Sequence, residues 1–138
     1  MRKSVVLFLL VALAFLGACS EVSPEWQAAS AAKGYYDCLK DGNAIGFLEG
    51  KAGVDSLPSD YGEQLLTAVK QYHADLQQKH GGLREVRISE EHYAKDLEQC
   101  RDSVLNVTYA FLILCFGDST QEEVMVPMTE HDGRWLMK

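Results

Sequence analysis

The apolar residues of the chain recur first at helical spacing and later at strand spacing. Over 23–41 and 58–80 they repeat every three to four positions, which predicts two amphipathic helices. A Ser-Pro pair opens the first segment and a Gly pair follows the second, and both are typical helix boundaries. A short helical turn over 44–48 lies between them. The predicted buried stripes are Trp26, Ala29, Ala32, Tyr36 and Leu39 in the first helix, and Tyr61, Leu65, Val69, Tyr72 and Leu76 in the second.

After Gly82 the pattern changes to a two-residue alternation that is typical of strands. Two Gly-Asp or Asp-Gly pairs, at 117–118 and 132–133, predict tight hairpin turns. Helices followed by antiparallel strands predict an α+β fold, with the N-terminal helices packed on one face of a four-stranded antiparallel sheet. The predicted strands are 83–89, 102–116, 120–128 and 134–138.

The strand over 102–116 has two faces of different character. One face is apolar along its whole length, and we expect it to carry the helices. The other face begins polar and becomes apolar. It is either covered, by the loop over 50–57 or by curvature of the sheet, or it is a binding or dimer surface. The expected core face is Leu105, Val107, Tyr109, Phe111, Ile113 and Cys115. The candidate interaction surface is Ala110, Leu112, Leu114 and Phe116.

The N-terminus has the pattern of a secretory signal peptide. A basic start, Met1-Arg2-Lys3, precedes an uninterrupted apolar run over 5–16. That run is too short to cross a bilayer comfortably, because a transmembrane helix needs about 20 apolar residues.

The residues Leu16-Gly17-Ala18-Cys19 then resemble the lipobox of bacterial lipoproteins. The resemblance implies cleavage before Cys19 and acylation of its thiol with chains such as palmitate, which would anchor the protein to a lipid bilayer. Residues 1–18 are then a lipoprotein signal peptide, 19–22 a short anchored tether and 23–138 a single α+β domain. We expect a location in the bacterial cell envelope. Ser20, in place of an aspartate, favours the outer membrane where the host has one.

The domain also resembles a group of small bacterial lipoproteins that carry a domain of unknown function. The resemblance rests on the lipobox, the first helix, the Lys79-His80-Gly81-Gly82-Leu83 junction, the long strands and the closing Asp132-Gly133-Arg134-Trp135. It implies a cystatin-like or nuclear-transport-factor-2-like fold, in which helices pack on a curved sheet around a cavity. Tyr36 and Tyr109 are the candidate residues of that cavity. The group has no assigned activity.

Charge and composition limit the classes of molecule that the protein is expected to bind. The formal net charge is −7, which disfavours nucleic acid because phosphate binding needs a clustered basic face. The acidic residues Glu21, Glu25, Glu122 and Glu123 are expected at the solvated surface. Cys38 and Cys115 remain candidates for a disulfide, since an exported protein permits one.

No motif predicts catalysis, a metal site or a cofactor. The sequence therefore favours a non-catalytic binding or interaction module of the cell envelope, with an envelope protein as a partner. The alternative is a small-ligand carrier or small envelope enzyme that uses the cavity between helix and sheet.

Overall fold

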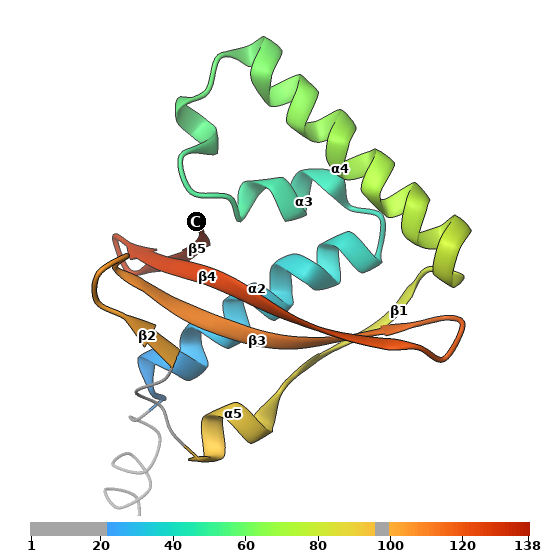
Figure 1. Ribbon diagram of the computed structural model, residues 1–138. Helices are drawn as coiled ribbons and strands as arrows, with labels where there is room; N and C mark the ends of the chain where they lie inside the picture. The colour runs from blue at the N-terminus through green and yellow to red at the C-terminus, as the bar shows by residue number, and fades with distance from the viewer. Residues whose placement is uncertain (1–21, 96–99) are drawn as a thin grey trace, which may run out of the picture.

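The computed structural model describes residues 22–95 and 100–138 (Figure 1). Its helices are α2 (Pro24–Lys40), α3 (Ala44–Glu49), the 3-10 turn η1 (Val54–Ser56), α4 (Ser59–His80) and α5 (Glu90–Lys95). Its strands are β1 (Leu83–Ile88), β2 (Arg101–Asp102), β3 (Val107–Phe116), β4 (Gln121–His131) and β5 (Arg134–Met137). The strand order is β1-β3-β4-β5, all antiparallel, with β2 paired to the start of β3. The predicted α+β fold is confirmed.

Helix α2 packs across one face of the sheet. Ser23 caps its first turn, because the Ser23 hydroxyl accepts a hydrogen bond from the Trp26 backbone N–H at 3.2 Å. Ala28, Ala29 and Ala32 are fully buried and belong to the same core cluster as the sheet residues. These small side chains let the helix lie close to the strands, so side chains fill the space between the two layers.

The face of β3 that meets the helices is the opposite of the predicted one. The four residues of the candidate interaction surface are only 0–2% exposed and lie in the core. The prediction is wrong because both faces of β3 are apolar, and a two-residue period alone does not say which face is covered. The buried residues are Ala110, Leu112, Leu114 and Phe116, while Tyr109, Phe111 and Ile113 are half-buried and point to the other side of the sheet.

The predicted strand 102–116 is interrupted near its start. Asp102 Oδ1 accepts hydrogen bonds from the backbone N–H groups of Val104 and Leu105, each at 3.0 Å. The turn that they form ends at Asn106, whose φ is 53°. Side-chain bonds of this kind compete with the strand ladder. Leu105 is consequently exposed instead of facing the core.

Both predicted hairpin turns are present. Asp132 and Gly133 have φ values of 52° and 77° and join β4 to β5. Gly117, in the turn between β3 and β4, packs against the end of α4, where a Cβ on Gly117 would lie 2.4 Å from the carbonyl oxygen of Gly81. Gly81 itself ends α4 with a φ of 71°. The C-terminal end of α4 is therefore fixed to the β3–β4 hairpin.

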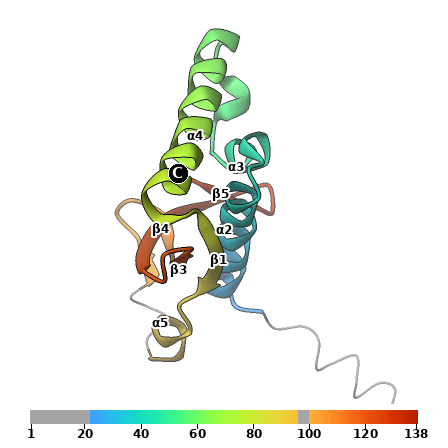
Figure 2. The ribbon, with the colours of Figure 1, turned by 90° about the vertical axis from the view of Figure 1, so that its right-hand side faces the viewer.

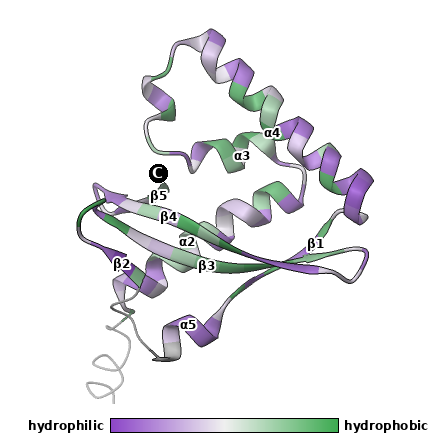
Figure 3. Cartoon of the chain, in the orientation of Figure 1, coloured by the Kyte–Doolittle hydropathy of each residue, from purple (hydrophilic) through white to green (hydrophobic). Residues whose placement is uncertain are grey.

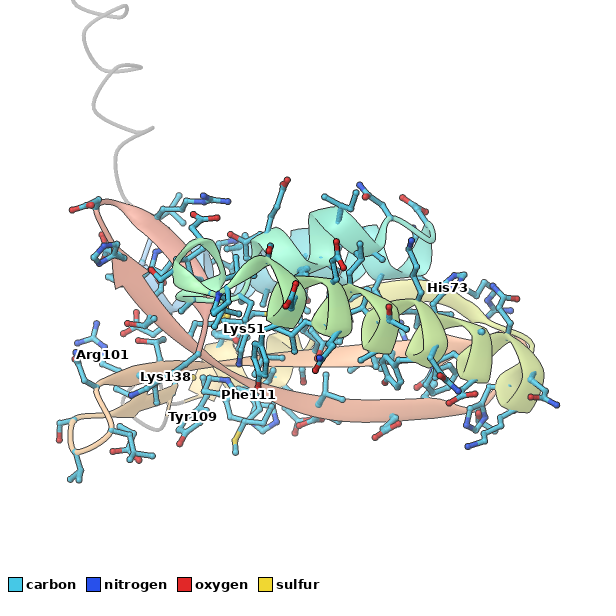
Figure 4. The ribbon with its side chains drawn as sticks, turned by 90° about the horizontal axis from the view of Figure 1, so that it is seen from above. Lys51, His73, Arg101, Tyr109, Phe111 and Lys138 are labelled. Atoms are coloured by element: carbon cyan, nitrogen blue, oxygen red, sulfur yellow. The ribbon has the colours of Figure 1, made fainter. Side chains whose placement is uncertain are left out.

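Helices α3 and α4, with η1 between them, form an arm that rises away from the sheet (Figure 2). Of the described residues of α4, Leu76 is the only buried one. The loop after α3 is held at β5, because Met137 donates a backbone hydrogen bond to Gly50 and Ala52 donates one to Met137, each at 2.7 Å. Lys51 Nζ adds a 2.9 Å bond to the carbonyl oxygen of Lys138 (Figure 4). The arm is thus attached to the sheet at the loop after α3 and at the C-terminal end of α4.

Candidate interaction site

A groove runs between the two helices of the arm. We call it the α3–α4 groove; it has a volume of about 340 Å³. Apolar side chains from both helices make its floor, and apolar segments of α3 and α4 stand out in Figure 3. The lining residues are Ile45, Leu48, Glu49, Val54, Asp55, Ser59, Gly62, Glu63 and Leu66.

The short connection between the helices sets the shape of the groove. Asn43 caps α3 by accepting a hydrogen bond from the Gly46 backbone N–H at 3.0 Å. Gly53, with a φ of 78°, then turns the chain into η1. Gly62 in α4 has no side chain, and a Cβ placed on it would meet no atom within 4 Å. The absence of a side chain at this lining position leaves open space beside α4.

Large apolar residues are exposed along the arm. Ile45, in the groove, is 58% exposed. On α4, Tyr61 is 52% and Tyr72 is 43% exposed, and Leu65 and Val69 are half-buried. The predicted stripe of α4 is therefore real as a pattern, but the sheet covers only its C-terminal end. Of these residues only Ile45 lines the α3–α4 groove, where it lies with Leu48, Val54 and Leu66, and apolar side chains gathered in one exposed groove are typical of a contact site for another molecule.

Carboxylates surround this apolar floor. Glu49, Asp55 and Glu63 line the groove, and Asp60 lies beside Glu63 in the first turns of α4. Within the described lining of the groove there is no Lys or Arg. Lys51, the nearest basic residue after α3, is bonded to the C-terminal strand instead. The groove thus combines an apolar floor with a negative rim.

The structure does not bring Tyr36 and Tyr109 into one cavity. Tyr36 packs on the helical side of the sheet, edge-on to Phe47 with ring centroids 5.3 Å apart. Burial raises the pKa of its hydroxyl, and the nearby Tyr72 and Glu122 raise that pKa further. Tyr109 belongs to the opposite face of β3. These two residues therefore do not line one cavity; a groove of about 540 Å³ does lie between α2 and β1, and its lining includes neither of them.

His80 and His92 lie next to carboxylates at separate places. His80 Nδ1 lies 3.0 Å from Asp118 Oδ2, and His92 Nε2 lies 2.7 Å from Glu123 Oε1. His92 also stacks on Phe111, with centroids 4.0 Å apart. Across 22–95 and 100–138, no group of three or more His, Cys, Asp or Glu side chains is arranged to hold a metal ion.

An ion pair between a buried glutamate at the start of α2 and an exposed arginine has no signal in the sequence. Glu25 is 2% exposed and forms an ion pair with Arg101 of β2, so its expected position at the solvated surface is wrong. Glu122 and Glu123 are exposed as predicted. A cavity of about 340 Å³ lies beside Arg101 (Figure 4), between β2, β3 and β4. Because the two charges are far apart in sequence, only the fold brings them together.

The cysteine and anchor predictions have different outcomes. Cys38 and Cys115 do not form a disulfide; Cys115 is buried, and Cys38 lies beside Gly46. Cys19, the signal peptide and most of the tether lie outside the described residues. No helix within the described part of the chain is both long and apolar enough to cross a membrane.

Comparison with known proteins finds a likeness of fold. No known protein family and no curated protein matches this chain. The chain is similar to a crystal structure of an NTF2-like transpeptidase from Campylobacter jejuni, with a TM-score of 0.55 and 14% sequence identity. The match covers 77% of this chain and 92% of the other. The arrangement of helices on an antiparallel sheet is therefore that of NTF2-like proteins.

Proposed function

We propose that this NTF2-like domain is a lipid-anchored protein of the bacterial cell envelope that acts as a non-catalytic interaction module. Its contact site is the α3–α4 groove, and its ligand is a basic segment of an envelope protein that carries aliphatic side chains. The single observation that carries the proposal is the exposed apolar groove on an arm that the rest of the fold leaves uncovered.

The chemistry of the groove supports this choice of ligand. Aliphatic side chains of a ligand would cover Ile45, Leu48 and Leu66. Each aliphatic side chain of the ligand would contribute about 1.5–3 kcal/mol to binding if it were fully buried in the groove. Lys or Arg residues beside them would face Glu49 and Glu63. Charges at the edge of an apolar contact mainly select the partner and speed its association.

The carrier or enzyme alternative lacks the geometry on which it depends. It needs a cavity between α2 and the sheet that the candidate tyrosines line, but Ala28, Ala29 and Ala32 pack directly into the core, and the groove of about 540 Å³ between α2 and β1 is lined by neither tyrosine. The candidate tyrosines lie on opposite sides of the sheet, Tyr36 on α2 and Tyr109 on the far face of β3. Among the residues that the structure describes, the observations favour the groove.

Photo-crosslinking in the intact bacterium tests this function. A benzophenone amino acid replaces Leu66 in the groove, and in a control chain it replaces Glu130, an exposed residue of β4. We expect a protein adduct at position 66 and none at position 130. Mass spectrometry of the adduct should identify a crosslinked segment that contains Lys or Arg together with aliphatic residues.

Gly62→Leu supplies the matched control for the groove itself. The new side chain occupies open space in the groove, and leucine is a better helix former than glycine, so the fold should be kept. We expect the adduct at position 66 to fall at least about tenfold, because the leucine side chain blocks the ligand. An adduct that is unchanged by Gly62→Leu, or no adduct at position 66, would contradict the proposed function.

A further inference from the structure

The turn between β2 and β3 exposes two adjacent aliphatic side chains. Val104 is 92% exposed and Leu105 is 53% exposed. Most turns carry Gly, Pro, Asn, Asp or Ser at their centre, and isolated apolar residues are common on protein surfaces. Two aliphatic neighbours at the tip of a turn are different, because they form a small apolar projection that an apolar medium can bury.

Side chains of the protein satisfy backbone groups of this turn. The N–H groups of Val104 and Leu105 donate to Asp102 Oδ1, each at 3.0 Å. The carbonyl oxygen of Leu105 accepts a hydrogen bond from Lys138 Nζ at 2.8 Å. A backbone group that enters a bilayer loses its water and needs a partner within the protein. These three groups already have one, so the turn is suited to partial insertion into lipid.

The turn lies at the end of the domain where the described chain begins. Figure 1 shows the β2–β3 turn, the first turn of α2 and the β4–β5 hairpin at one end of the molecule, and the β3–β4 hairpin at the other end. Arg101 of β2 pairs with Glu25, which fixes β2 beside the start of α2. From Cys19 to Val22 the chain spans at most roughly 10 Å. An acylated Cys19 would therefore hold this end of the domain close to the bilayer.

Basic side chains lie beside the turn, within reach of lipid phosphates. Figure 4 shows Arg101 and Lys138 at this end of the molecule. The side chain of Arg101 is 58% exposed, and its guanidinium has N–H donors beyond the one that meets Glu25. Glu130 and Asp132 of the neighbouring hairpin are also exposed, so the surface is not strongly cationic. The two aliphatic side chains therefore supply the main contact, and the basic residues assist it.

We propose that the β2–β3 turn inserts Val104 and Leu105 into the bilayer that holds the anchor, and that this second contact fixes the orientation of the domain on the membrane. The two side chains reach the boundary between headgroups and acyl chains, roughly 5–10 Å deep. Arg101 and Lys138 then lie at the level of the phosphates. The inference rests on the lipid anchor of the proposed function, and the lining of the α3–α4 groove shares no residue with this surface.

Photo-crosslinking to lipid tests the inference. A diazirine amino acid replaces Leu105 in the turn, and in a control chain it replaces Gln121, an exposed residue at the opposite end of the sheet. The protein is purified from the membrane fraction, its acylation is read from its intact mass, and it is placed in vesicles of phosphatidylethanolamine and phosphatidylglycerol. We expect at least about tenfold more lipid adduct at position 105 than at position 121.

Two substitutions of Val104 give a matched comparison in the chain with the probe at position 105. Val104→Asp places a charge at the tip and should lower the lipid adduct at least about tenfold, whereas Val104→Ile should keep it. Both should leave the fold unchanged, because this side chain is 92% exposed, and circular dichroism verifies it. If an acylated chain gives no excess of adduct at position 105, or if Val104→Asp causes no loss, the inference is overturned and the anchor stands. A chain of unmodified mass that does not float with the vesicles would overturn both.

Discussion

The side chain of Tyr93 hydrogen-bonds to the backbone of β3 at a place where β1 has already ended. Its hydroxyl accepts a hydrogen bond from the Phe111 backbone N–H at 2.9 Å and donates one to the carbonyl oxygen of Tyr109 at 3.4 Å. Its ring packs edge-on against Trp26, with centroids 5.7 Å apart. Tyr93 thus ties α5 to β3 and to the first turn of α2, at a place where the chain has no strand.

Burial raises the pKa of Tyr93 from 10.0 to about 12. The folded state therefore favours the neutral phenol, and this stabilisation is complete below pH 10 and is lost as the pH rises toward 12. We expect Tyr93→Phe to remove one ionisation near pH 12 from an ultraviolet titration. It should also lower the free energy of unfolding at pH 7 by about 1–2 kcal/mol, because Phe111 loses its acceptor. An unchanged titration curve would contradict this role.

Asp118, in the β3–β4 turn, has a lowered pKa, whereas the pKa of Tyr93 is raised. Hydrogen bonds from the Thr120 side chain and backbone, together with His80, lower its pKa from 3.8 to about 2. The folded state favours the carboxylate, so its stabilisation is complete above pH 4 and is lost as the pH falls toward 2. NMR titration of the Asp118 carboxyl should give the low pKa. Asp118→Asn should remove this contribution, so the free energy of unfolding should fall less steeply between pH 4 and pH 2 in the variant than in the wild type. An equal pH dependence in the two chains would disprove this role of Asp118.

At the level of elements, substitutions on the two faces of the sheet should have different effects on the free energy of unfolding. Leu112 is fully buried under α2, whereas Met125 on the neighbouring strand is 56% exposed on the far face. We expect Leu112→Ala to lower the free energy of unfolding by about 3 kcal/mol, since it leaves a cavity in the core. Met125→Ala should change it by less than about 0.5 kcal/mol.

Urea unfolding followed by circular dichroism measures both effects. Lysine at Leu112 or Leu114 should unfold the domain, because it would place an unpaired charge in the core. A folded Leu112→Lys chain would restore the sequence-based assignment of the faces.

For the whole molecule, the proposed anchor and the domain should be independent. The described core begins at Glu25 and Ala28, after the lipobox and tether. We expect Cys19→Ala to move the protein from the membrane fraction to the soluble fraction with no change in melting temperature of the domain. Intact mass should reveal an acylated N-terminal Cys19 in the wild type and no acyl chains in the variant. A wild-type chain of unmodified mass would contradict the anchor.

The sequence by itself determined the order and kind of the main elements. Ser23-Pro24 and Gly81 mark helix ends, and Asp132-Gly133 marks a hairpin turn, by local chemistry that does not depend on distant residues. Only the tertiary structure decided which face of β3 is buried, since ten consecutive mainly apolar residues satisfy either choice until α2 is docked. It also decided that Glu25 meets Arg101, and that the apolar stripe of α4 is covered only in part. Helical spacing predicts an apolar stripe, but the position of the helix in the fold determines whether that stripe is covered.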